Sequence, residues 1–300
     1  MSKLAVIIPY YKLKFFGETL DSLEKQTCKD FNLYIGNDAS PENPEETIKK
    51  HLKNTPYHYF VYEENLGGQN LAKQWERVIS ESKSEEWFVI LGDDDVFSEN
   101  FVEEFYRVID EVEKIGSNVI RFGQRWIDEN NNEIYSSTVF PEKIRPEDHI
   151  HYKIIEKKRS SLSEHIFKKS SYLKFGFRNF PLAWNSDDMA VFEFSDGKPI
   201  FFSNKAFVNV HVTQDNISGK SDNTELKLAS KKIFEKILIR KYYKCLRKDT
   251  LKQLVNEHVY YKRNHSTPLG YNDLKIYWHL KDYKNFILAL FSLVRPKFDR

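Results

Sequence analysis

Residues 87–105 read WFVILGDDDVFSENFVEEF and join an apolar run to a charged turn. Apolar residues run into Gly92 and then into Asp93, Asp94 and Asp95, after which a helical pattern begins. Three adjacent carboxylates at the end of a buried strand repel one another unless a positive charge lies among them. Two explanations stay open at this point: a solvated acidic turn, or a site for Mg²⁺ or Mn²⁺, which prefer oxygen ligands.

The composition is that of an ordinary globular protein. The chain has 300 residues, of which 40% are hydrophobic and 30% charged, and this length predicts about two domains, or one α/β domain with an appendage. The net charge of +2 gives no sign of a nucleic-acid partner, and we expect none. No apolar run approaches the roughly 18 residues that a transmembrane helix needs.

The two cysteines, Cys28 and Cys245, form neither a metal-binding spacing nor a disulfide framework. The chain starts Met-Ser-Lys-Leu, without the apolar segment of a signal peptide. These features together predict a location in the reducing cytoplasm.

The first hundred residues alternate between apolar runs and segments with apolar residues at helical spacing. The expected strands are residues 4–9, 31–38, 57–63 and 87–92, and the expected helices are residues 16–26, 44–53, 71–80 and 99–115. Such alternation is typical of a parallel sheet covered by helices on both faces. Ligands bind beyond the carboxyl ends of these strands, where Asp38, Asn65 and the three aspartates would meet. This convergence favours the cation site over the acidic turn.

The remaining two thirds of the chain are less regular. We expect strands at residues 119–128, 133–140 and 199–212, helices at residues 161–177 and 186–194, and a helical pattern from about residue 224 to the end. The predicted organisation is one domain at 1–224, with a nucleotide-binding half at 1–118 and an acceptor-binding half at 119–224. Residues 225–300 would form a basic, aromatic-rich helical extension.

Three further polar sites each allow a structural and a functional interpretation. Asp38 fits either an Asx turn or an acceptor for a nucleobase. The loop at Asn65 and Gly67 fits either a helix cap or a phosphate site, to which Lys73 would add charge. The pair Asp187 and Asp188 fits either first-turn acids of a helix or a general base for an acceptor hydroxyl.

The order of these motifs resembles the family 2 glycosyltransferases of the GT-A fold over roughly residues 3–220. VIIPYYK resembles the opening strand of the family, and the end of LDSLEKQTCKDFNLYIGNDAS resembles its D-D-G-S, with Asn37 at the first Asp. NLGGQNLAKQWERVI resembles N-x-G-x-x-x-A-R-N, with Lys73 at the arginine. VILGDDDVFSENFVEE resembles the metal-motif segment L-D-x-D-D, with Gly92 at its first Asp. VNVHVTQDNIS resembles the tail R-x-H-x-x-N-I-S, with His211 at the arginine and Thr213 at the histidine.

The resemblance implies a role for each matching residue. Asp38 would contact the nucleobase, Asp94 the ribose or diphosphate, and Asp95 the metal, while Asp93 falls at a variable position. The implied donor-binding set is Pro9, Tyr11, Asp38, Asn65, Gly67, Lys73, Asp93 and Asp94. The implied metal ligands are Asp95, Asp94 and His211. The pair Asp187 and Asp188 matches the family's E-D pair, which makes Asp188 the expected catalytic base.

The resemblance also implies the chemistry. A sugar from a nucleotide diphosphate donor, with UDP-sugar as the expected one, would pass to a hydroxyl group in a single inverting displacement that depends on Mg²⁺ or Mn²⁺. The expected acceptor is a saccharide or lipid-linked saccharide of bacterial surface polysaccharide synthesis.

The end of the chain is strongly basic. Residues 226–300 contain 18 Lys and Arg against 6 Asp and Glu, a net charge of +12, so the rest of the chain carries −10. Three interpretations stay open: a helical cap on the body, peripheral contact with an anionic membrane surface on the cytoplasmic side, or a dimer contact.

Two rival functions also fit parts of the sequence. ILGDDDVF matches the signature of haloacid-dehalogenase-like phosphatases, in which Asp93 would be the nucleophile. That signature normally ends the first strand of its sheet, however, and here it ends the fourth. The other rival is a catalytically inactive protein that binds a sugar nucleotide or a partner, motivated by Asn37 and Gly92.

Overall fold

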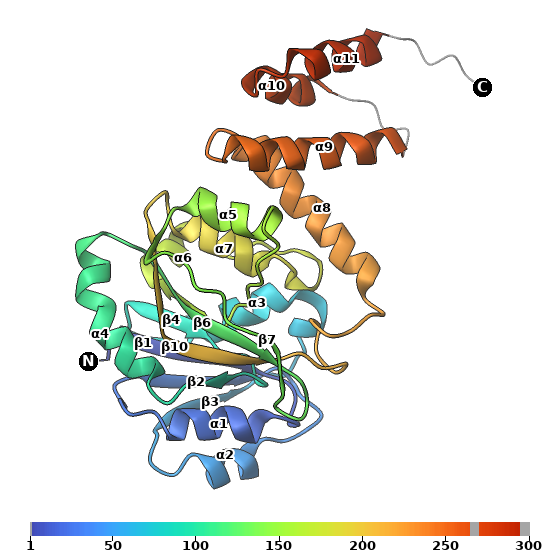
Figure 1. Ribbon diagram of the computed structural model, residues 1–300. Helices are drawn as coiled ribbons and strands as arrows, with labels where there is room; N and C mark the ends of the chain where they lie inside the picture. Colours follow the sequence, from blue (N-terminus) through green and yellow to red (C-terminus); the bar gives the residue numbers. More distant parts are fainter. Residues whose placement is uncertain (1, 265–269, 295–300) are drawn as a thin grey trace. The chain divides into compact units, whose positions relative to one another are not determined.

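The computed structural model describes residues 2–264 and 270–294 (Figure 1). The chain divides into two compact units. The first consists of Met1–Pro146 and Lys158–Ser230, and the second of Glu147–Lys157 and Lys231–Arg300.

The first part of the first unit alternates between strands and helices, as predicted. Its elements are β1 (Leu4–Tyr10), α1 (Phe16–Glu24), β2 (Asn32–Asn37), α2 (Glu45–His51), β3 (Tyr57–Val61), α3 (Gly67–Ser80), β4 (Trp87–Ile90), β5 (Val96–Phe97) and α4 (Phe101–Lys114). Strands β3, β2, β1 and β4 lie side by side in this order and are parallel. Their carboxyl ends therefore share one edge, where the polar loops follow.

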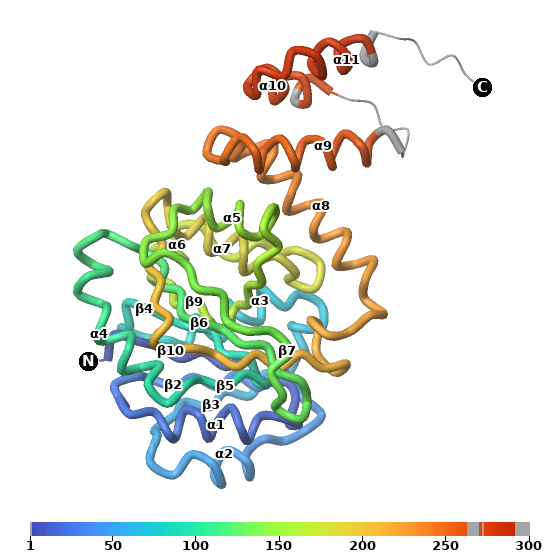
Figure 2. Tube along the Cα trace, in the orientation of Figure 1, coloured from blue at the N-terminus to red at the C-terminus, as the bar shows by residue number. Residues whose placement is uncertain are grey.

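The second part of the unit completes the sheet. Its elements are β6 (Val119–Ile127), β7 (Glu133–Tyr135), β8 (Lys143–Ile144), β9 (His165–Lys168), α6 (Lys169–Phe175), the 3-10 helix η1 (Pro181–Ala183), α7 (Ser186–Phe194) and β10 (Ile200–His211). Within the described residues the strands form one ten-stranded sheet, ordered β3-β2-β1-β4-β9-β6-β10-β5, with β7 and β8 attached at its side. Figure 2 follows the chain through these strands.

The predicted helix at residues 161–177 is wrong in its first half. His165–Lys168 forms β9, which is inserted antiparallel between β4 and β6, and only Lys169–Phe175 is helical. A buried four-residue run has no periodicity that separates a strand from a helix. Pairing on both edges of β9 decides the matter here.

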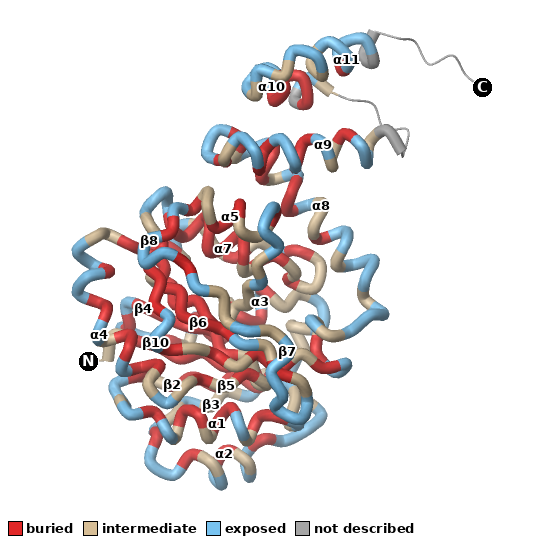
Figure 3. The backbone as a smooth tube through the Cα atoms, in the orientation of Figure 1, coloured by how far each residue is buried: buried red, intermediate tan, exposed pale blue. Residues whose placement is uncertain are grey.

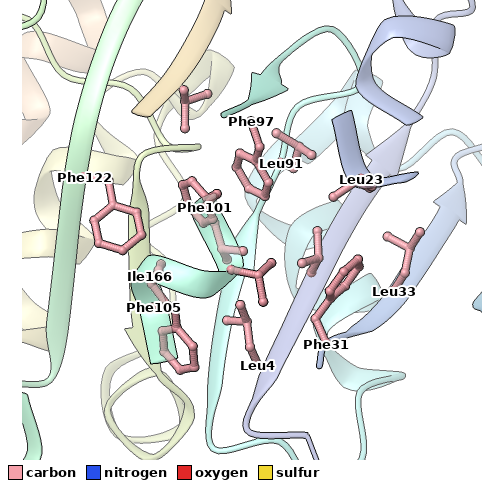
Figure 4. Close-up of a cluster of buried hydrophobic side chains, with 14 of the residues drawn as sticks. Leu4, Leu23, Phe31, Leu33, Leu91, Phe97, Phe101, Phe105, Phe122 and Ile166 are labelled. Carbon is pink, nitrogen blue, oxygen red and sulfur yellow. The ribbon is translucent and has the colours of Figure 1, made fainter. Parts of the chain in front are cut away.

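One face of the sheet is packed mainly by α1 and α4. Alternate residues of β1, Leu4, Val6 and Ile8, point to this face and are fully buried, because side chains of a strand alternate between its faces. They join Phe105 of α4 and Leu23 of α1 in a continuous cluster (Figure 4). Each such side chain stabilises the fold by about 2 kcal/mol when it is fully buried, so the cluster holds the strand ends in fixed positions.

The second unit is helical, as the sequence predicts for the end of the chain. Its described elements are α5 (Pro146–Ile154), α8 (Thr224–Lys241), α9 (Lys248–Asn264), α10 (Tyr271–His279) and α11 (Tyr283–Val294), and the first turns of α8 belong to the first unit. No helix among the described residues has the length and apolar character needed to cross a membrane. The functional division at residues 118 and 224 stays a prediction.

Candidate active site

The loop after β4 is anchored to the end of β1. The Asp93 carboxylate oxygen Oδ2 accepts hydrogen bonds from the backbone amides of Tyr11 at 2.6 Å and Lys12 at 2.7 Å. The Tyr11 carbonyl in turn accepts a hydrogen bond from the Ser40 hydroxyl at 2.6 Å. These bonds join the loops that follow β4, β1 and β2 at one edge of the sheet.

The side chains of Asp94 and Asp95 converge over Gly92. A Cβ atom at position 92 would lie 3.0 Å from a carboxylate oxygen of each. The Asp95 oxygen concerned, Oδ2, also accepts a hydrogen bond from the Ser163 hydroxyl at 2.5 Å, and the same hydroxyl accepts one from the Gly92 amide at 3.1 Å. Glycine at position 92 therefore leaves the space that two neighbouring carboxylates require.

Burial perturbs all three carboxyl groups of this loop. Burial, together with the nearby charge of Asp94, raises the pKa of Asp93 to about 7. Burial also raises the pKa of Asp94, and burial with repulsion from Asp94 raises the pKa of Asp95 well above its usual value. The Lys12 ammonium group opposes these shifts at Asp93 and Asp94. One lysine does not balance three carboxylates, so the loop has the electrostatics of a cation site.

His211 lies against this loop but is already engaged through both ring nitrogens. Its Nδ1 contacts the backbone carbonyl of Asp94, and its Nε2 lies 3.2 Å from the side-chain oxygen of Asn131. The ring stacks on Phe15 with the centroids 4.2 Å apart. In this arrangement His211 positions the Asp94 backbone, and its predicted role as a metal ligand stays a prediction.

The segment after β10 also reaches the acidic loop. The Asn216 side-chain amide lies 3.4 Å from Asp94 Oδ2 and 2.5 Å from the His211 carbonyl, to which it donates. Lys12 contacts the Asp215 carbonyl, and Lys14 Nζ lies 2.6 Å from the Asp215 carboxylate. The segment after β10 therefore contacts residues that follow β1 and residues that follow β4.

Asp38 is held by the loop that opens α3. Its two carboxylate oxygens accept hydrogen bonds from the amides of Leu66 at 2.8 Å and Gly67 at 2.7 Å, and the Arg77 guanidinium group also contacts it. Burial raises the pKa of Asp38, while the amides of Gly67 and Leu66 and the charge of Arg77 oppose that rise. A Cβ atom at position 67 would lie 2.6 Å from the Asp38 carboxylate, so this contact requires glycine.

The other predicted donor residues include Asn65, Lys73 and Pro9. The Asn65 side-chain oxygen accepts a hydrogen bond from the Gly68 amide at 2.6 Å, so Asn65 orders the start of α3. Lys73 is exposed on α3, one turn beyond a break in the helix at Asn70. Pro9 is half-buried near the end of β1.

Asp187 and Asp188 occupy the first turn of α7. Asp188 is fully buried and accepts a hydrogen bond from the Asn185 side-chain amide at 2.9 Å, whereas Asp187 is partly exposed. Asn185 has a positive φ of 66°, which turns the chain sharply into the helix. The preceding η1 contacts α3, the helix that opens at the Asp38 loop.

The residues present fit a divalent cation held partly by a ligand. Asp94 and Asp95 offer hard oxygen donors close together, which suits Mg²⁺ or Mn²⁺. In the part of the chain that the structure describes, no three His, Cys, Asp or Glu side chains form a complete metal site. A cation here would therefore need donors from the ligand, as is usual for Mg²⁺ bound with phosphates.

A separate cavity of about 220 Å³ lies elsewhere in the first unit. Its lining includes Arg107, Glu142, Phe202 and Lys205, and none of the predicted site residues contributes to it. We do not assign this cavity to the donor.

Sequence reasoning missed several residues of this site. Ser163 fell within a segment predicted to be helical, and Arg77 lay inside a quoted motif without a local signal that pointed to Asp38. Lys12 and Asn216 lay inside quoted motifs, but no local signal pointed to their contacts with the aspartates.

Comparison with solved structures gives the same fold at low sequence identity. The Staphylococcus aureus protein TarS, residues 1–349, aligns with a TM-score of 0.60 and 15% identity over 99% of this chain and 93% of the TarS chain. Its complex with UDP-GlcNAc aligns with a TM-score of 0.61 and 16% identity over 96% of this chain and 81% of that chain. The mannosyltransferase PcManGT from Pyrobaculum calidifontis, in complex with GDP-Man and Mn²⁺, aligns with a TM-score of 0.50 and 14% identity over 97% and 74% of the two chains.

Sequence comparison gives the family. Glycosyltransferase GlyG of Streptococcus pneumoniae serotype 4 is 29% identical over 113 residues, which are 37% of this chain and only 36% of that relative's length. The family model described as glycosyl transferase family 2 matches residues 5–178, more than half of the chain. The fold is the GT-A fold predicted from the motifs, and the chain belongs to glycosyl transferase family 2.

Proposed function

We propose that the protein is a metal-dependent inverting glycosyltransferase that moves a sugar from a UDP-sugar to a hydroxyl group. The observation that carries the proposal is the convergence of Asp94 and Asp95 over Gly92 at the carboxyl edge of a parallel sheet. A cation at Asp95 would neutralise the charge that develops on the departing diphosphate. The complexes of TarS with UDP-GlcNAc and of PcManGT with GDP-Man and Mn²⁺ support a nucleotide-sugar donor and a divalent cation.

The chain's own residues divide the work in this proposal. Asp38 and the Asn65–Gly67 loop bind the nucleotide, and Lys73 adds charge near the diphosphate. Asp188 takes the proton from the acceptor hydroxyl, and Asp187 precedes it in the first turn of α7. We further propose that the acceptor is a saccharide or lipid-linked saccharide of bacterial surface polysaccharide synthesis.

The phosphatase alternative is less well supported by the geometry. A nucleophilic Asp93 would have to attack a phosphate, but one of its carboxylate oxygens already accepts two backbone hydrogen bonds at 2.6 and 2.7 Å. These bonds fit a carboxylate that ties two loops together.

The test is release of UDP by the full chain from a panel of UDP-sugars, each supplied together with saccharide acceptors, with Mn²⁺, with Mg²⁺ and with a chelator. We expect release that requires a metal and falls in Asp95→Asn but not in Ser170→Ala, a change of an exposed serine on α6. Metal-dependent hydrolysis of a generic phosphate ester without UDP release would support the phosphatase. Tight UDP binding without turnover on any supplied saccharide would support the inactive alternative.

A further inference from the structure

Helix α11 is apolar on the side that faces its neighbour and on the side that faces solvent. Its inner side contacts α10, where Ala289 is fully buried and Phe286 lies 5.5 Å from the ring of Trp278. Its outer side carries five large exposed apolar residues: Tyr283, Ile287, Leu288, Leu290 and Phe291. A solvent-facing helix normally carries polar residues on its exposed side. The exposed side of α11 is therefore more apolar than that of an ordinary surface helix.

Helix α10 extends this surface with an aromatic residue. Leu274, Ile276 and Tyr277 are buried on its inner side, whereas Trp278 is 61% exposed, close to the 64% of Phe291 on α11. Trp278 also lies edge-on to Tyr283, with the centroids 5.6 Å apart. We call the exposed residues of the two helices the hairpin surface: Trp278, Tyr283, Ile287, Leu288, Leu290 and Phe291. In Figure 3 most of α11 and part of α10 have the pale blue of exposed residues.

The charges at the hairpin surface are positive. Lys275, Lys281 and Lys284 are exposed around it. Of the two acids in the described part of the hairpin, Asp273 is buried against Lys262 and His258, whereas Asp282 is half-buried and accepts a hydrogen bond from the Asn285 backbone amide at 3.2 Å. Three exposed lysines against one half-buried carboxylate leave the hairpin surface with a net positive charge.

We propose that the hairpin surface lies on an anionic membrane, with its apolar side chains in the interface and its lysines against acidic headgroups. Interfacial helices combine aromatic and aliphatic residues with Lys, and such lysines gain free energy near anionic lipids. A second copy of the chain fits the hairpin surface less well than a membrane does. By helical spacing Lys284 lies amid the apolar residues of α11, so two paired copies would bring like charges together in a buried contact. This inference goes beyond the proposed activity, and its test uses no catalysis.

The experiment is flotation of the full chain with vesicles of phosphatidylcholine alone and with vesicles of equal parts phosphatidylcholine and phosphatidylglycerol. We expect binding to the anionic vesicles that weakens with added salt, and little binding to the neutral ones. Trp278→Gln with Phe291→Gln should weaken binding by at least about ten-fold. Lys281→Asn with Lys284→Gln should weaken it by about thirty-fold; asparagine is chosen because Lys281 has a positive φ of 57°.

Matched controls distinguish binding through the hairpin surface from nonspecific binding by exposed apolar side chains or lysines elsewhere in the chain. Val61→Ser with Leu173→Gln removes two apolar side chains of the first unit that are 64% and 72% exposed, and Lys50→Gln with Lys53→Gln removes the same charge there. Both controls should bind as wild type does. Wild type that ignores anionic vesicles overturns the proposal, as does binding that both hairpin variants retain. A wild-type dimer in solution that Trp278→Gln with Phe291→Gln dissociates would assign the surface to a second copy and also overturn it.

Discussion

The Ser163 hydroxyl lies 2.5 Å from the Asp95 carboxylate and at the same time accepts a hydrogen bond from the Gly92 amide at 3.1 Å. Ser163 precedes β9, whereas Asp95 and Gly92 follow β4, and these two strands pair in the sheet. Glu164, the next residue, forms a buried ion pair with Arg121 of β6 at 2.8 Å. The donor to Asp95 is therefore fixed by the middle of the sheet, and the orientation of the proposed metal ligand depends on it.

Ser163→Ala should weaken metal-dependent UDP binding about ten-fold, because a hydrogen bond to a charged group contributes about 1.5–3 kcal/mol. The concentration of Mn²⁺ that gives half-maximal UDP binding should rise. Calorimetric titration checks this, with Ser170→Ala as the control. Loss of thermal stability with an unchanged Mn²⁺ requirement would reduce Ser163 to a structural residue.

Gly92→Ala should displace the carboxylates of Asp94 and Asp95, since its Cβ would lie 3.0 Å from an oxygen of each. We expect a loss of about 1–3 kcal/mol in the free energy of unfolding and weaker metal-dependent UDP binding. Urea denaturation and titration measure the two effects. Ser170→Ala, at an exposed position of α6, is the control. Wild-type behaviour of Gly92→Ala would show that the two carboxylates need no such space.

Asp188→Asn should lower kcat for sugar transfer by about 10²–10⁴-fold, the usual range for a general base, and leave UDP binding unchanged. Asp188 is fully buried beside Asn185, whereas Asp187 is partly exposed, so Asp187→Asn should cost much less. Steady-state kinetics on both variants decide between them. A larger loss in Asp187→Asn would move the base to Asp187.

Asp273 should make the second unit sensitive to acid. Burial alone would raise its pKa, but hydrogen bonds from His258, the Gly270 amide and Lys262 outweigh burial and hold the pKa of Asp273 well below its usual value. A lowered pKa in the folded state means stability that is present above the ordinary value of about 3.9 and lost as the pH falls below it.

Asp273→Asn should therefore cost about 2–3 kcal/mol of unfolding free energy at neutral pH, with a difference from wild type that shrinks below about pH 4. Chemical denaturation followed by circular dichroism at several pH values measures it. Asp110→Asn, at an exposed position of α4, should show no such dependence. A penalty for Asp273→Asn that stays constant down to strong acid would contradict this account of its pKa.

The repeating part of the fold could be predicted because its signal is local. Apolar runs such as residues 4–9 and 87–92 and the helical spacing after them give each element from its own sequence. The order of those elements placed Asp38, Asn65 and Asp93–Asp95 at one edge of the sheet. In contrast, β9 owes its conformation to pairing with β4 and β6, and no local pattern encodes a pairing between distant strands.

The contacts within the candidate site were harder to predict for a similar reason. The carboxylates could be named from their motifs, but their partners Ser163 and Arg77 come from distant segments and belong to common residue types. His211 stood out as a lone histidine, yet its environment of Asp94, Asn131 and Phe15 depends on three separate loops. Such relationships follow from tertiary packing alone.

The most direct test of the proposed function is calorimetric titration of UDP into wild type and Asp95→Asn, each with and without Mn²⁺. Wild type should bind UDP more tightly with Mn²⁺, and Asp95→Asn should lose this dependence. Ser170→Ala should retain it. UDP binding by wild type that is absent, or that is the same with and without Mn²⁺, would contradict a metal-assisted donor site at Asp95.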